Sequence, residues 1–148
     1  MTLEEESVMP TDAIHAFLGA RQTAVMSLAG DHGPYAVPIT YRFDPETERF
    51  FFRLIYPAGS EKRQFLPDVP ECWLVAYEED EPNYRSVIAK GVPTEIRSSD
   101  IKSEHVVQLG QTSRPLFEMW SPSRAELDIR LYELETTELT GRHISITE

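Results

Sequence analysis

Three cationic side chains and one serine, close together in the sequence, could bind a phosphate group. Arg53 interrupts an apolar run, and Lys62 and Arg63 follow Ser60 at the start of a short helix predicted over 60–66. The amide groups in the first turn of a helix attract anions, and neighbouring cations add to that attraction. Two alternatives stay open. The lysine and arginine in the helix are solvated surface residues, or Arg53 pairs with a carboxylate of the protein.

A second candidate for binding chemistry is the stretch from Gly33 to Tyr41, which alternates apolar and other residues as a half-buried strand does. Pro38 lies in the middle of it. Because proline donates no ladder hydrogen bond, this strand must lie at an edge or a bulge, with backbone groups left free on one side. Such groups suit a planar ligand that accepts and donates hydrogen bonds. The alternative is an edge strand that proline protects against aggregation.

The elements that must position these residues are mostly short strands joined by turns. We expect a helix over 12–19 with Thr11 as its N-cap and Gly19 at its end. A further helix of about ten residues should end at Leu109, and one long strand should bend near Gly91. The predicted strands span 23–29, 33–41, 49–55, 71–78, 84–96, 127–134 and 138–146. The run from Phe50 to Ile55 is almost wholly apolar, which indicates burial on both faces.

The composition limits the classes of protein that the chain can belong to. Its 148 residues suit one domain over 1–148, with 1–10 as a flexible acidic N-terminus. No apolar run is long enough to span a membrane and the N-terminus is acidic, so we expect a cytoplasmic protein with no membrane partner. Cys72 is the only cysteine, which excludes an internal disulfide, and we expect it to be a buried small hydrophobe.

The charge is strongly negative, with a net value of -11 and only three lysines against eleven arginines. A field of that sign repels phosphate backbones, so we expect no nucleic-acid partner. An acidic surface that is poor in lysine also resembles the surfaces of halophilic proteins. In a chain that almost avoids lysine, each remaining lysine is a stronger candidate for a specific role.

The order of these segments resembles the pyridoxamine 5'-phosphate oxidase-like family, the FMN-binding split barrels. The resemblance covers about 22–91, with weaker support to Arg142. It is carried by four segments taken together, none of which is specific alone: 33–41, 50–53, 59–62 with Leu66, and 86–91. The resemblance implies a mainly β fold with short flanking helices, a six-stranded antiparallel split β-barrel of Greek-key type.

The resemblance also implies a homodimer that binds FMN at the subunit interface. Four matched residues would lie along the flavin ring, a second group would hold the phosphate, and two residues would reach the flavin across the dimer. These groups are Pro38, Ile39, Thr40 and Tyr41; Arg53, Ser60 and Lys62, with Arg63 as a further candidate; and Tyr84 with Ser86. The flavin carries the chemistry, so no catalytic side chain is nominated. An oxidoreductase acting on a small molecule is the expected activity.

The C-terminal segment departs from the family pattern. True pyridoxamine phosphate oxidases end in an arginine, leucine and proline signature, whereas this chain continues through Gly141, Arg142 and His143. Vitamin B6 oxidation is therefore disfavoured, and the generalist branch with the nitroimidazole reductase-like proteins is closer. Two alternatives stay open: the same fold binding F420 or haem, with His143 or His32 involved, and a non-catalytic flavin-binding or dimeric interaction protein.

The phosphate assignment predicts the effect of removing one cation. Lys62→Ala should weaken FMN binding by about 1.5 to 3 kcal/mol, the scale of a hydrogen bond to a charged group, and leave the dimer intact. Titration with FMN followed by absorbance gives the dissociation constant. An unchanged constant would contradict the assignment of Lys62 to the phosphate.

Overall fold

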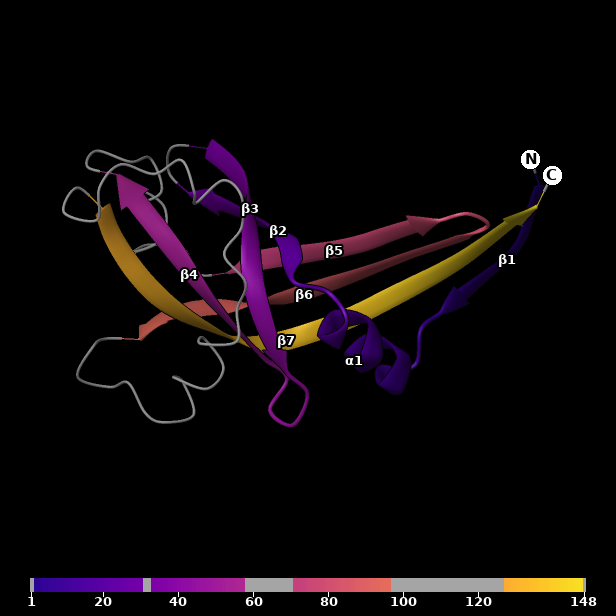
Figure 1. Cartoon of the computed structure of the whole chain (residues 1–148), viewed down its shortest axis with the longest axis horizontal. Helices are drawn as coiled ribbons and strands as arrows, with labels where there is room; N and C mark the ends of the chain where they lie inside the picture. The colour runs from indigo at the N-terminus through magenta and orange to yellow at the C-terminus, as the bar shows by residue number, and fades with distance from the viewer. Residues whose placement is uncertain (1, 31–32, 58–70, 97–126, 148) are drawn as a thin grey trace.

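Seven strands and one helix make up the part of the chain that the computed structural model describes, residues 2–30, 33–57, 71–96 and 127–147 (Figure 1). In chain order they are β1 (Thr2–Val8), α1 (Thr11–Gly19), β2 (Thr23–Gly30), β3 (Gly33–Asp44), β4 (Arg49–Pro57), β5 (Cys72–Asp80), β6 (Asn83–Ile96) and β7 (Leu127–Thr147). The helices predicted over 60–66 and up to Leu109 lie outside the described residues. No helix within these ranges has the length and apolar character needed to cross a bilayer.

Six of the strands form a closed antiparallel ring. Their order is β7, β4, β3, β2, β5 and β6, and β6 pairs again with β7. The sequence β5, β2, β3, β4 across the sheet is a Greek key, because three hairpin-connected strands are followed by one that returns beside the first. The predicted six-stranded Greek-key barrel is therefore confirmed. The seventh strand, β1, lies outside the ring on β7.

The N-terminal segment is a paired strand, which corrects the expectation of a flexible acidic lead over 1–10. Residues Thr2 to Val8 form an antiparallel ladder with the last residues of β7, from Thr147 to Arg142. That end of β7 extends beyond the barrel with β6 on one side only, and β1 pairs with its other edge. The backbone groups of β7 that would otherwise be unpaired on that side explain why an acidic segment with poor strand propensity is ordered there.

The final strand is one continuous element of 21 residues, whereas the sequence predicted two strands, over 127–134 and 138–146. Gly141, within the second of these predicted strands, is needed for close packing. A Cβ atom at Gly141 would lie 2.9 Å from Sδ of Met9 and 3.0 Å from Cγ1 of Ile14. The segment that begins α1 therefore packs directly on the backbone of β7, and the amide of Met9 donates to the Gly141 carbonyl at 2.9 Å.

Helix α1 is held by its apolar face and by a hydrogen bond from a side chain. Its buried residues include Phe17 and Leu18, as the sequence predicted. The N-cap position belongs to Pro10 and has no side-chain hydrogen bond, so the prediction of Thr11 as the N-cap was wrong. His15 Nε2 lies 2.9 Å from Oε2 of Glu48 in the turn between β3 and β4. The helix is thus fixed to the same strands that carry the candidate site.

The main core fills the interior of the ring. Tyr41, Phe50, Phe52 and Leu134 are among its fully buried side chains. A second, smaller cluster on the opposite face of β4 contains Phe51. The prediction that β4 is covered on both faces is confirmed.

Strands β3 and β4 stay paired over only four residues each. The ladder between them runs from Asp44 and Arg49 to Tyr41 and Phe52 and then stops. Beyond that point β3 pairs only with β2, and β4 pairs only with β7, within the described residues. We call this point of separation the fork. Pro38 lies in the part of β3 that has a neighbour on one side only, as its missing amide hydrogen required.

Strand β6 is bent where the sequence predicted. The pairing register with β7 shifts between Lys90 and Gly91, which defines a bulge. A Cβ atom added at Gly91 would lie only 2.3 Å from the backbone carbonyl oxygen of Glu135. Glycine is therefore required for the close approach of the two longest strands.

Replacing Gly91 with alanine should destabilise the barrel by at least about 1 to 3 kcal/mol, because the added carbon meets backbone that cannot move aside. Chemical denaturation measures the free energy of unfolding. Gly19→Ala is the matched control, since a Cβ there has no atom within 4 Å. Equal stability of the two variants would show that the β6 and β7 backbones are not in this close contact.

Candidate functional site

The fork between β3 and β4 places an unusual polar group on the outer face of the barrel. The alternation of β3 sends Ile39 and Tyr41 into the core, whereas Pro38 and Thr40 face outward. Thr40 is nevertheless only 4% exposed, and its Oγ1 atom has no hydrogen-bond partner among the described residues. A buried hydroxyl without a partner costs about 1 to 3 kcal/mol, so the position fits a group that the hydroxyl can bond.

Arg53 lies on the other arm of the fork. The β3–β4 register pairs Tyr41 with Phe52, so the next positions on the two strands are Thr40 and Arg53. Both face outward, and the Arg53 side chain is half-buried. The structure therefore brings together one predicted ring-contacting residue and one predicted phosphate-binding residue. Ser60, Lys62 and Arg63 lie outside the described residues.

Tyr84 and Ser86 lie on the same outer face but on β6. Register places Ser86 between Tyr77 of β5 and Arg142 of β7. These side chains border a hollow of about 170 Å³ that Tyr84 also lines. The small serine side chain leaves this space open.

The two halves of the predicted site are separated within one chain. β2 and β5 lie between β3 and β6, so Thr40 and Ser86 are three strand spacings apart. At ~4.8 Å for each spacing, the path along the sheet is roughly 14 Å. Pro38 and Thr40 therefore form one group with Arg53, and Tyr84 and Ser86 form another.

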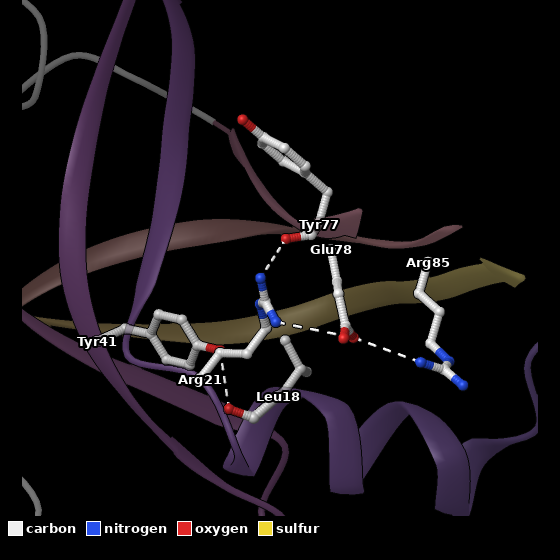
Figure 2. Close-up of polar contacts among 6 residues, drawn as sticks. All are labelled: Leu18, Arg21, Tyr41, Tyr77, Glu78 and Arg85. Carbon is white, nitrogen blue, oxygen red and sulfur yellow. Dashed lines mark hydrogen bonds and ion pairs between the residues drawn. The ribbon is translucent and has the colours of Figure 1, made fainter. Parts of the chain in front are cut away.

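The side chain of Tyr41 serves the fold. Its hydroxyl donates to the backbone carbonyl of Leu18 at 2.8 Å and joins β3 to the end of α1 (Figure 2). Burial raises the pKa of Tyr41 well above its ordinary value, although nearby Arg21 partly opposes that shift. The buried side chains of Ile39 and Tyr41 cannot reach a ligand on the outer face, and the Tyr41 amide already donates to the Gln22 carbonyl at 2.9 Å.

A larger hollow, of about 280 Å³, lies over β2 and β5 and was not predicted from the sequence. Its lining joins the end of α1 to three strands: Arg21, Thr23, Ala24, Val25, Pro38, Val75, Ala76 and Tyr77. The β2–β5 ladder ends at Val25 and Val75, and beyond it Arg21 donates to the backbone carbonyl of Tyr77 (Figure 2). The period-two pattern of β5 placed Val75 and Tyr77 on one face, but nothing in the sequence placed Arg21 beside them.

The histidine considered as a haem ligand is engaged within the protein. Nε2 of His143 lies 2.9 Å from Oδ1 of Asn83. His32 lies outside the described residues. Among the residues in the described ranges, no three or more histidine, cysteine, aspartate or glutamate side chains gather as a metal site would require.

The architecture and the fork define an antiparallel split barrel. The sequence matches the family described as pyridoxamine 5'-phosphate oxidase over residues 10–143. The chain therefore belongs to this family, as its motifs indicated. No curated protein matches the sequence significantly.

Solved structures share the fold. A FAD-binding protein from Mesorhizobium loti superposes with a TM-score of 0.76 at 15% identity, covering 96% of this chain and 98% of its own. The FAD-binding protein from Mycobacterium smegmatis gives 0.69 at 14% identity, covering 95% and 100%. A candidate 5-nitroimidazole antibiotic resistance protein from Bacteroides thetaiotaomicron gives 0.67 at 12% identity, covering 95% and 88%. At these identities the likeness establishes the fold.

Cys72 is fully buried, which makes it a poor nucleophile. Burial raises the pKa of its thiol from 9.0 to about 12, and the nearby Glu71 carboxylate adds to the shift. A thiol in this state should react with a disulfide reagent only after denaturation. Rapid reaction in the native protein would contradict the burial.

The same pKa shift predicts a loss of stability at alkaline pH. The unfolded thiol ionises above pH 9 and the folded thiol only near 12, so the free energy of unfolding should fall as the pH rises between them. The slope is about 1.4 kcal/mol per pH unit for this group. Chemical denaturation at several pH values measures it. Cys72→Ala should show a shallower decline, and an equal slope in both proteins would show that Cys72 does not cause it.

Proposed function

We propose that the protein binds FMN at the fork and is a flavin-dependent oxidoreductase that acts on a small molecule. The observation that carries the proposal is the buried Thr40 hydroxyl beside the one-sided edge of β3, in a chain of the pyridoxamine 5'-phosphate oxidase family. Backbone groups of Pro38 and Thr40 that point away from β2 would hydrogen-bond the edge of a planar ring. The solved relatives described as FAD-binding proteins support a flavin as the cofactor.

The phosphate would be held by Arg53 at the fork and by residues that follow it in the sequence. Arg53 lies at the adjoining position on β4, and Ser60, Lys62 and Arg63 follow it in the chain. A doubly charged phosphate needs charge-assisted donors. Arg53 supplies a planar guanidinium that can donate two parallel hydrogen bonds, which suits phosphate oxygens.

The bound flavin would supply the transfer of a hydride or an electron pair. The residues of this chain would bind and orient the cofactor and keep one face of it open to a substrate. No catalytic side chain is assigned. Cys72 carries the only thiol. It is buried in the barrel core, so it is not accessible as a redox nucleophile.

We propose a homodimer as the assembly that completes the site. In one chain Thr40 and Ser86 are separated by two intervening strands. A flavin ring held at the fork could meet Tyr84 and Ser86 if these residues come from a second copy. The exposed side chains along the outer face of β5, Trp73 and Tyr77, supply apolar surface for such a contact.

The first test is the visible absorption spectrum of the purified protein before and after addition of FMN or FAD. Flavin bands at one per subunit support the proposal, and the two titrations distinguish the cofactors. A Soret band would indicate haem. No binding of FMN, FAD, F420 or haem would contradict a cofactor role and favour an interaction protein. Sedimentation of the same sample tests the dimer.

Arg53→Ala should weaken FMN binding by about 1.5 to 3 kcal/mol, because it removes a charged donor to the phosphate. Arg49→Ala is the matched control on the same strand. Arg49 also lies on the outer face of β4 but forms ion pairs with Glu133 and Glu135, at 3.0 and 3.6 Å. Equal dissociation constants for both variants would contradict a phosphate site at Arg53.

A further inference from the structure

The hollow over β2 and β5 owes its shape to a gap in the barrel. The ladder between the two strands ends at Val25 and Val75. The next inward-facing residues, Ala24 and Ala76, are small and buried. Because small side chains line the point where the strands part, a space of about 280 Å³ remains there. That volume is close to the lower limit for small-molecule pockets, roughly 300 Å³.

The walls of this hollow have an apolar part and a polar part. Val25, Val75 and Pro38 supply apolar contact on three neighbouring strands, and Tyr77 adds an aromatic side chain that is 58% exposed. The polar part consists of the Thr23 hydroxyl and the Arg21 guanidinium. Among the described residues that line the hollow, Arg21 alone is charged.

Arg21 is positioned by the fold and keeps donors for a ligand. Its Nη2 atom donates to the Tyr77 carbonyl (Figure 2). Its guanidinium also lies 4.9 Å from the centre of the Phe17 ring. Nη1 is 3.8 Å from the Glu78 carboxylate, which is too long for a hydrogen bond. A guanidinium has five N–H donors, so this fixed cation can still bind a carboxylate.

The Glu78 carboxylate does not cancel the charge of Arg21. It is shared with Arg85, whose Nη1 lies 3.4 Å from the same oxygen. Two guanidinium groups and one carboxylate leave this network with a net positive charge, in a protein whose net charge is -11. In the 170 Å³ hollow on β6, by contrast, the negative charges of Glu78 and Glu79 balance the positive charges of Arg85 and Arg142. The larger hollow is therefore the better anion site.

We propose that the hollow over β2 and β5 binds small carboxylates with a single-ring apolar body, and that it is the substrate pocket. The ring would lie on Val25, Val75 and Pro38, and the carboxylate would meet Arg21 and Thr23. The role as substrate pocket rests on the proposed function, because Pro38 belongs both to this hollow and to the strand proposed to lie along the flavin. Binding of the carboxylate does not depend on the flavin.

The test uses benzoate as the probe and benzamide as its neutral counterpart, with the full-length protein in a calorimetric titration. Benzoate should bind, and benzamide should bind at least about tenfold more weakly, because a charged hydrogen bond is lost. Arg21→Ala should reduce benzoate affinity by a similar factor, and Arg49→Ala should not change it. Val75→Phe fills the hollow without removing the cation and should also abolish binding. This second variant tests the site should Arg21→Ala fail to fold.

The outcomes separate this proposal from the proposed function. Loss of benzoate binding in Arg21→Ala with FMN binding retained supports the pocket. If benzoate binds but no flavin does, the hollow is a carboxylate site. Its role as the substrate pocket and the flavin proposal are then both overturned. No benzoate binding, or equal binding of benzamide, overturns the pocket and leaves the flavin proposal intact. Unchanged benzoate affinity in Val75→Phe would also overturn the assignment of the pocket.

Discussion

The separation of β3 from β4 is the constraint on which the candidate site depends. A ring of six strands buries a continuous core, and the ladder of hydrogen bonds around it must be interrupted if a backbone edge is to remain available. The interruption falls after Tyr41 and Phe52, whose aromatic side chains are buried in the core. The barrel is therefore anchored by packing immediately beside the fork. The next residues outward, Thr40 and Arg53, are polar, and their strands are no longer bonded to each other.

The fork also explains why proline is tolerated in the middle of β3. Pro38 pairs with Val25 in β2 and has no second strand beside it in the described part of the chain. A proline at that position cannot donate toward a strand from β4, so it opposes closure of the gap. The same residue contributes to the hollow over β2 and β5. Pro38 thus borders both proposed ligands.

Much of the barrel could be predicted from the sequence because its strands are strongly patterned. The alternation along β5 and the apolar run of β4 each gave the correct buried faces. The errors arose where tertiary contacts override local signals. Residues 135–137 were expected to separate two strands, but Glu135 and Thr136 pair with β6, and the strand is continuous. The acidic segment 2–8 has no apolar pattern, and only the exposed edge of β7 explains its pairing.

The candidate site was predictable in part, for a related reason. Pro38 indicates an edge strand because proline has no amide hydrogen, and Arg53 is the one charged residue in an apolar run. Both residues can therefore be recognised from a single sequence. Arg21 is not, since it lies between a helix and a strand with no pattern around it. Its position depends on the Tyr77 carbonyl, which is 56 residues away in sequence.

The position of Arg21 shows how an acidic protein can present a cation to an anionic ligand. Long-range repulsion by a net charge of -11 opposes anion binding anywhere on the surface, so a local site must offset it at short range. Arg21 does so through fixed geometry. Phe17 lies beneath its guanidinium, the Tyr77 carbonyl orients it, and Glu78 is divided between it and Arg85. Because these contacts order the guanidinium before a ligand arrives, less side-chain entropy is lost on binding. The same contacts join the end of α1 to β5 across the gap in the barrel, so the residue that closes the structure there also provides its cationic group.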